Sequence, residues 1–196
     1  MNRRSEPSCD FDDDFCGWEN ITGLSSRNTH WQRSNGKTDE NIWPGPGDEY
    51  AFIKKIGSRS YLKGDIKTTK IPSSWGDFCV NLNYYLSDGK DTLEIYHILN
   101  NDPESIGECK YISTEWQKCD ITFTTDNTSG AENYIKFHGE TYTNIVAINN
   151  VNISKGACQD SPVTTTTDFS TTSLMSTTSD QPGDTVSVGK LFTHVS

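Results

Sequence analysis

Apolar and polar residues alternate along much of this chain, which is the pattern of a half-buried β-strand. In residues 79–86 every even-numbered position is apolar, and two of the odd-numbered positions are Asn. The polar run 87–90, Ser-Asp-Gly-Lys, has the composition of a turn. Alternation resumes over 93–97, where Leu, Ile and His occupy the odd-numbered positions. Together these segments predict a β-hairpin over 79–98.

The same pattern continues towards residue 159. Cys119, Ile121 and Phe123 share one face of a predicted strand, and further strands are predicted over 134–137 and 145–153. No window carries a capped apolar stripe with the period of a helix. Short strands separated by Gly, Asn, Asp and Ser predict an all-β, two-sheet antiparallel sandwich. The length exceeds that of a minimal immunoglobulin sandwich and leaves room for a larger jelly-roll.

The last predicted strand changes phase within its length. Val146 and Ile148 share one phase, whereas Val151 and Ile153 share the opposite one. Two interpretations are open. A β-bulge near residues 149–150 would turn both pairs towards the core and re-aim the two Asn side chains. Alternatively, the strand is buried on both faces.

Composition changes abruptly after Cys158. Between Ser161 and Ser179, 13 of 19 residues are Ser or Thr. Such a stretch has too few apolar groups to offset the entropy of ordering, so we expect residues 160–196 to form a disordered stalk or linker. It is either an O-glycosylated, mucin-like stalk or a plain flexible linker. The folded domain is then expected over residues 8–159.

The formal net charge of −10 over 196 residues restricts the choice of partner. An acidic chain repels phosphate backbones and anionic headgroups, so we expect neither nucleic-acid binding nor direct lipid binding. No apolar run reaches the roughly 18 residues of a transmembrane helix, so we expect no direct membrane insertion by this chain. Cations and basic protein surfaces are compatible partners.

The six cysteines form an even set, with no C-x-x-C pair and no Cys/His spacing typical of zinc sites. An oxidising compartment explains such a set, which allows about 15 pairings. N-glycosylation sequons at Asn20, Asn127 and Asn152 agree with secretion. Residues 1–7 are polar, unlike a signal peptide. The chain is therefore either cytosolic with reduced thiols or a piece of a longer extracellular protein, and we expect the second.

Several short motifs follow one another in a recognisable order. They are C-D-F-D at 9–12, C-G-W at 16–18, W-Q-R at 31–33, G-P-G-D at 45–48, C-V-N-L-N-Y-Y at 79–85, T-L-E-I at 92–95, I-N-N-V-N-I at 148–153 and G-A-C at 156–158. Over residues 9–158 this series resembles the MAM domain, with its C-x-F-E, W-x-R, G-P-x-x-D-H-T and closing I-D-D-I-x-I-x-x-G-x-C. The chain departs from that pattern at Glu49 and Tyr50, which replace the His-Thr, and at Asn149 and Asn150, which replace the acidic pair.

The resemblance implies a two-sheet jelly-roll with disulfides Cys9–Cys16 and Cys79–Cys158. Cys109 and Cys119 are extra to the family pattern and are then left to pair with each other. A chain-entropy estimate gives the long Cys79–Cys158 loop roughly 4–5 kcal/mol of stabilisation. Family members lie in the ectodomains of membrane proteins such as meprins, neuropilins and receptor tyrosine phosphatases. The resemblance implies that they support adhesion or oligomerisation there, without catalysis.

The acidic run at residues 10–14 is the candidate for ion binding, because calcium takes about 6–8 oxygen ligands. By resemblance to MAM domains that hold a cation, Asp12, Asp48 and Asn149 are candidate ligands for Ca²⁺ or Na⁺. We expect no other cofactor. The Asn pair removes two formal charges relative to the family. The alternative is therefore a solvated acidic turn, with the Asn pair hydrogen-bonded to the bulged backbone.

Nothing in the chain indicates catalysis, so we expect a non-enzymatic module. The four His are scattered, and neither H-E-x-x-H nor G-x-S-x-G occurs. The five Trp raise a lectin alternative, because indole faces stack on sugars. Trp18 and Trp31 match positions that the resemblance assigns to the core. Trp43 and Trp75 lie in turn-rich stretches, where they either make exposed contacts with protein or glycan or pack locally.

The first functional hypothesis is an extracellular adhesion or recognition module of a secreted or cell-surface protein. Its partner would be protein, including a second copy of the same chain. The alternative is a carbohydrate-binding jelly-roll module, which depends on fold analogy. A third hypothesis, the non-catalytic part of a larger secreted or membrane-bound protease, differs from the first only in what lies beyond this chain.

Overall fold

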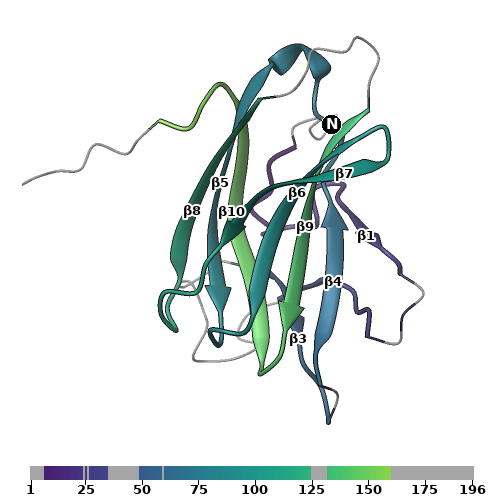
Figure 1. Ribbon diagram of the computed structural model, residues 1–196, viewed down its shortest axis with the longest axis vertical. Helices are drawn as coiled ribbons and strands as arrows, with labels where there is room; N and C mark the ends of the chain where they lie inside the picture. The colour runs from purple at the N-terminus through teal and green to yellow at the C-terminus, as the bar shows by residue number, and fades with distance from the viewer. Residues whose placement is uncertain are drawn as a thin grey trace, which may run out of the picture. The chain divides into compact units, whose positions relative to one another are not determined.

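The computed structural model describes residues 7–23, 25, 27–34, 49–58, 60–124 and 132–159. The expected Ser/Thr-rich segment 160–196 lies outside these residues, as do Trp43, Asp48 and Asn127. Within the described part, two five-stranded sheets pack face to face, and every strand pair is antiparallel (Figure 1). The prediction of an all-β, two-sheet antiparallel sandwich is confirmed.

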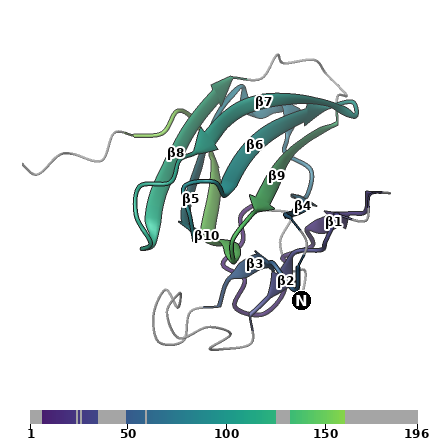
Figure 2. The ribbon, with the colours of Figure 1, turned by 60° about the horizontal axis from the view of Figure 1, so that its bottom comes forward.

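The first sheet has the strand order β1-β4-β9-β6-β7, and the second has the order β2-β3-β10-β5-β8 (Figure 2). The strands are β1 (Glu19–Ile21), β2 (Gln32–Arg33), β3 (Ala51–Lys54), β4 (Leu62–Lys67), β5 (Asp77–Leu86), β6 (Thr92–Leu99), β7 (Asp102–Cys109), β8 (Gln117–Thr124), β9 (Asn133–Thr141) and β10 (Ile145–Lys155). A 3-10 turn, η1 (Ser73–Trp75), precedes β5. None of the described residues forms a helix long and apolar enough to span a membrane.

Period-two alternation turns one face of each long strand towards a common core. In β9 the odd-numbered residues are buried and the even-numbered residues are half-buried. The core includes Val80 and Leu82 from β5, Ile95 from β6 and Phe137 from β9, all of them inaccessible to solvent. Burying one such side chain contributes about 1.5–3 kcal/mol, so the facing apolar rows hold the two sheets together.

The strands predicted over 79–98 are present, but the prediction that they form a hairpin is wrong. β5 pairs with β8 and β10, whereas β6 pairs with β7 and β9 in the other sheet. The connection therefore turns a corner between the layers. Buried Asp91 holds this corner, because it accepts hydrogen bonds from Ser87 Oγ and from the backbone of Tyr142. The apolar faces of β5 and β6 both point into the core, each from its own sheet.

The β-bulge in the last strand is confirmed. The register between β10 and β5 shifts between Asn149 and Asn152, and Asn150 has a left-handed φ of 48°. The shift lets residues on both sides of it, Val146 and Ile148 before and Val151 and Ile153 after, all lie in the core. Beyond the end of β3, Cys9 takes the free edge of β10 and exchanges two backbone hydrogen bonds with Val151.

Three disulfides connect Cys9 with Cys16, Cys79 with Cys158, and Cys109 with Cys119. They are the pairs expected from the sequence. The third joins the edge strand β7 of one sheet to the edge strand β8 of the other. It therefore fixes the layers to each other along the side where both sheets present unpaired edges.

Trp31 fills a slot in the core that two glycines create. Gly64 of β4 and Gly139 of β9 are register partners, and the indole N–H of Trp31 donates to the Gly64 carbonyl at 3.0 Å. A Cβ at Gly139 would lie 2.9 Å from Cζ2 of Trp31, and a Cβ at Gly64 would lie 2.9 Å from Cγ2 of Ile53. The paired glycines therefore leave the room that the Trp31 indole and the Ile53 side chain occupy.

Replacing Gly139 by Ala is expected to destabilise the domain by about 1–3 kcal/mol, because the added methyl overpacks the Trp31 slot. Gly89→Ala is the matched control, since its Cβ would lie at an ordinary 3.5 Å from the Tyr111 ring. Its stability should stay within about 0.5 kcal/mol of the parent. Denaturant unfolding of both variants checks the expectation, and equal stability of the two would contradict the steric account.

Candidate functional site

The predicted cation ligand Asp12 lies on the exposed N-terminal loop, where Arg33 is its main contact. The Arg33 guanidinium donates from Nη1 to the backbone carbonyls of Phe11 (3.2 Å) and Asp12 (2.9 Å). The same guanidinium forms an ion pair with Glu49. The carboxylate of Asp12 accepts weakly from the Glu49 N–H at 3.4 Å. The Arg33 guanidinium thus already binds the backbone oxygens of Phe11 and Asp12 and the carboxylate of Glu49.

The second predicted ligand, Asn149, is buried at the bulge with 1% of its surface exposed. Its Oδ1 accepts the N–H of Asn150 at 2.7 Å. This is the hydrogen bond to the bulged backbone that the alternative interpretation expects. No partner for its Nδ2 lies among the described residues. Because Asp48 lies outside those residues, the site at Asp12, Asp48 and Asn149 for Ca²⁺ or Na⁺ stays a prediction.

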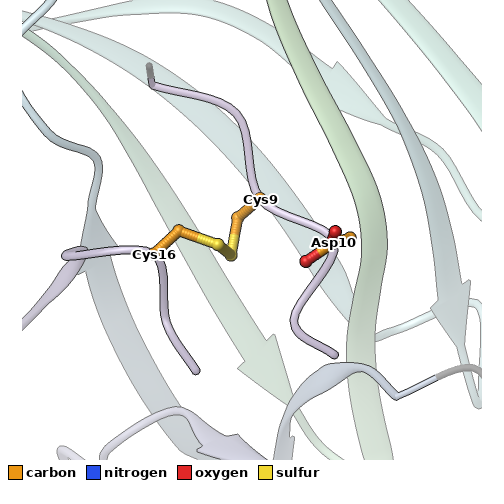
Figure 3. Close-up of side chains that lie close together, drawn as sticks. All are labelled: Cys9, Asp10 and Cys16. Atoms are coloured by element: carbon orange, nitrogen blue, oxygen red, sulfur yellow. A yellow bond between two sulfur atoms is a disulfide. The ribbon is translucent and has the colours of Figure 1, made fainter. Parts of the chain in front are cut away.

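Two groups of Cys and Asp side chains have ligand atoms within 4.8 Å of one another: Cys9, Asp10 and Cys16, and Cys79, Asp120 and Cys158. In each group both sulfurs belong to a disulfide, as Figure 3 shows for the first. A metal binds the thiolate of a cysteine. Each group therefore offers a cation only one carboxylate, and neither forms a metal site by itself.

The outer side of the first sheet carries a dense set of charged and aromatic side chains. In β4, β6 and β9 the residues between the core positions point outward and are half-buried. We call this set the charged face; it consists of Asp65, Lys67, Glu94, Tyr96, Tyr134, Lys136, His138 and Glu140. Strand register places Asp65 and Glu94 on either side of His138, and Lys67 and Tyr96 on either side of Lys136.

Lysine ammonium groups lie over the tyrosine rings of this face. Lys136 Nζ is 4.1 Å from the ring centroid of Tyr96, and Lys67 Nζ is 4.5 Å from that of Tyr134. Such cation–π contacts contribute about 0.5–1 kcal/mol at exposed positions. The Tyr96 hydroxyl donates to Glu94, and this hydrogen bond raises the pKa of the phenol to about 12. These contacts therefore fix the side chains of the charged face in the unbound domain.

His138 is held between two carboxylates. Its Nδ1 lies 2.7 Å from Asp65, and its Nε2 lies 3.3 Å from Glu140. The hydrogen bond to Asp65 raises the pKa of His138, against the opposing effect of burial, and Glu140 adds to the rise. Burial alone would raise the pKa of Asp65, but the hydrogen bond and charge of His138, with Lys136, lower it overall. Since both ring nitrogens face acceptors, neither serves as a general base.

The tryptophans among the described residues pack against other side chains rather than forming an open platform for a sugar. Trp18 and Trp31 lie in the core, as the resemblance implies. Trp75 is half-buried and packs against the core, which agrees with local packing rather than with an exposed contact. Trp116 packs against a smaller cluster, on the outer side of the second sheet, that includes Phe52, Tyr85 and Ile145.

The two predicted glycosylation sites among the described residues differ in exposure. Asn20 lies in β1 and is half-buried, whereas Asn152 lies in β10 and is exposed. Asn127 is outside the described residues.

The charged face cannot be recognised from the sequence alone. The polar phase of the segments around Asp65, Glu94 and His138 is readable in the sequence. The strand order cannot be read from the sequence. It brings β4, β9 and β6 side by side, although the 3-10 turn and β5 lie between β4 and β6 in the chain.

Residues 9–159 match the family model of the MAM domain, meprin/A5/mu. The chain belongs to the MAM family. The MAM domain is a non-catalytic, jelly-roll extracellular module, and such domains generally mediate protein interactions. The disulfides agree with that placement. A comparison with curated proteins gave no match.

Solved structures similar to this MAM domain share its fold at low sequence identity. The K1 cleaved adhesin domain of Lys-gingipain from Porphyromonas gingivalis W83 is 12% identical with a TM-score of 0.58, over 76% of this chain and 98% of that one. The K2 cleaved adhesin domain of Lys-gingipain is 11% identical with a TM-score of 0.56, over 78% of this chain and 99% of that one. TmCBM61, solved with β-1,4-galactotriose, is 13% identical with a TM-score of 0.50, over 80% and 99%.

The raised pKa of His138 makes part of the MAM domain's stability depend on pH. A histidine whose folded pKa lies above the ordinary value of 6.5 stabilises fully below that pH, and the contribution is lost as the pH rises through the folded pKa. The stability difference between the parent and His138→Gln should therefore be larger near about pH 5.5 than near about pH 8.5. Asp65, whose folded pKa lies below 3.8, stays ionised throughout that range.

Buried His97, whose pKa is lowered by burial, is present in both proteins and cancels in the difference. Urea unfolding of the parent and of His138→Gln at the two pH values is the measurement. A stability difference that does not change with pH would contradict the charged His138 bridge.

Proposed function

We propose that this MAM domain is an extracellular recognition module that associates with a second copy of itself through the charged face. Support comes from the arrangement of charge on that face. Asp65 and Glu94 lie at the level of His138, whereas Lys67 and Lys136 lie two residues along their strands. At about 3.4 Å per residue the two rows are roughly 7 Å apart.

Adjacent rows of opposite charge suit a two-fold contact between identical surfaces. A two-fold axis that lies in the plane of the contact, parallel to the two rows and midway between them, places the lysine row of one copy over the row of Asp65 and Glu94 of the other, so that each contact between opposite charges forms twice. Tyr96 lies in the lysine row beside Lys136, and tyrosine is enriched among residues that dominate binding energy. The fixed side chains lower the entropy that association costs.

The alternative of a carbohydrate-binding module is favoured only by the fold that the chain shares with TmCBM61, whose structure contains β-1,4-galactotriose. A sugar ring needs an open aromatic face to stack on. In the charged face a lysine ammonium lies over Tyr96 and another over Tyr134. A sugar would have to displace these contacts, so protein binding is the better-supported proposal.

Charge reversal tests the proposal on the full chain, secreted behind a foreign signal peptide. Lys136→Glu and Glu94→Lys should each weaken self-association by about tenfold or more, which is about 1.4 kcal/mol. The double variant should recover part of the loss, because the exchanged charges again face each other across the two-fold axis. Lys155→Glu, an exposed change at the end of β10, should have no effect.

Sedimentation velocity at several concentrations and two salt levels measures these effects. Association that Lys136→Glu leaves unchanged would contradict the assignment of the surface. A domain that stays monomeric and binds a glycan array would support the carbohydrate alternative instead.

A further inference from the structure

The two described sequons use their carboxamide groups in different ways. Asn20 Oδ1 accepts the backbone N–H of Trp31 at 2.7 Å, and Asn20 Nδ2 donates to the backbone carbonyl of Trp31 at 3.1 Å. One side-chain amide thus pairs with both polar groups of a single residue, as a neighbouring strand would. We call this pair the Asn20 clamp.

N-glycosylation changes the atoms that form such a clamp. The Asn Nδ2 attacks C1 of a lipid-diphosphate-linked oligosaccharide, the bond from C1 to the phosphate oxygen breaks, the lipid diphosphate leaves, and Nδ2 loses one proton. The product is a secondary amide, which prefers the trans form by about 2.5 kcal/mol. In that form the sugar carbon lies on the same side of the C–N bond as Oδ1, and the remaining hydrogen lies on the opposite side.

The Asn20 clamp needs a hydrogen on the side of Nδ2 that the sugar would occupy. A two-point pair with Trp31 uses Oδ1 together with the hydrogen nearest to it. A glycan on Asn20 would therefore remove the bond to the Trp31 carbonyl and place a sugar against the backbone of a residue that is only 2% exposed. Leaving a buried carbonyl without its donor costs about 1–3 kcal/mol, and the Trp31 carbonyl is part-buried. Attachment to this sequon would therefore break the Asn20 clamp and destabilise the folded domain.

Asn152 has the opposite character. It is exposed, and its neighbours Val151 and Ile153 point into the core, so its side chain leaves the outer side of the second sheet. Its Oδ1 accepts from Ser8 Oγ at 3.3 Å, and a trans glycosylamide keeps that acceptor. Within the described residues no hydrogen bond uses its Nδ2. A shallow hollow of about 250 Å³, lined by Ser8, Cys9, Asp10, Asn150, Val151 and Asn152, adjoins it.

We propose that Asn152 carries an N-glycan and that Asn20 is a structural clamp that remains unmodified in the folded protein. The inference rests on the extracellular location in the proposed function, but not on self-association. Asn152 lies on the outer side of the sheet β2-β3-β10-β5-β8, whereas the charged face belongs to the other sheet. A glycan at Asn152 shields one side of the sandwich and leaves the charged face open.

The test uses the full chain, secreted from mammalian cells behind a foreign signal peptide. Ser129→Ala in every protein removes the Asn127 sequon from the readout. Thr22→Ala and Ser154→Ala each remove one sequon while keeping its Asn, so the clamp remains intact in both. Peptide-N-glycosidase treatment in heavy-oxygen water followed by peptide mass spectrometry measures occupancy at each Asn.

We expect secreted protein to be occupied at Asn152 and unmodified at Asn20. Ser154→Ala should lose the glycan, while Thr22→Ala should lose none and should keep the melting temperature of the parent. Asn20→Ala should lower the melting temperature although it removes no glycan. An Asn20 glycan on folded, secreted protein, or an empty Asn152, would overturn the inference.

Disulfide mapping of the same sample separates this failure from failure of the proposed function. Three intact disulfides with an empty Asn152 would refute the glycan site and leave the extracellular location standing. Six free thiols would refute the location itself.

Discussion

Trp31 lies between the two sheets, and most of the domain's architecture can be followed outward from it. The indole takes the space that Gly64 and Gly139 leave empty, and its N–H is satisfied by the Gly64 carbonyl. Its backbone is held by the Asn20 carboxamide. The next residues, Gln32 and Arg33, form β2, and Arg33 bonds the N-terminal loop that carries Asp12. The Trp31 side chain thus lies between both sheets, and Arg33, two residues later, bonds the segment enclosed by the Cys9–Cys16 disulfide.

Besides Trp31, the disulfides and the bulge in β10 help to enclose the core between the two sheets. Cys109–Cys119 connects the edge strands β7 and β8 across the layers. The bulge at Asn149 changes the phase of β10, so that one strand of 11 residues serves the core along its whole length. A rigid sandwich of this kind presents its outer faces as fixed surfaces. The charged face can therefore act through complementarity of charge and shape, without rearrangement of the fold.

Period-two alternation and the order of the motifs made much of this architecture predictable from the sequence. They predicted the strands that include Val80, Ile121 and Ile148 and offered the bulge as one of two interpretations, while the resemblance to the MAM domain implied two disulfides and left Cys109 and Cys119 for the third. The prediction of a hairpin failed at segment 87–91 because turn residues have the same composition in a hairpin and in a corner between sheets. Buried Asp91, which decides between them, bonds residues about 50 positions away. The role of Asn20 was equally out of reach, since its sequon is visible in the sequence but its contact with Trp31 is not.

Amide and indole hydrogen exchange at Trp31 tests the central place of this residue most directly. If Trp31 connects the sheets as described, its backbone N–H and its Nε1–H should exchange only through global unfolding. Their protection should then equal that of Val146 and Ile148 in the central strand β10, and should fall with them as denaturant is added. Exchange of the Trp31 hydrogens at the faster rate of the short edge strand β1, independent of global stability, would show that the slot opens locally. That result would contradict the account.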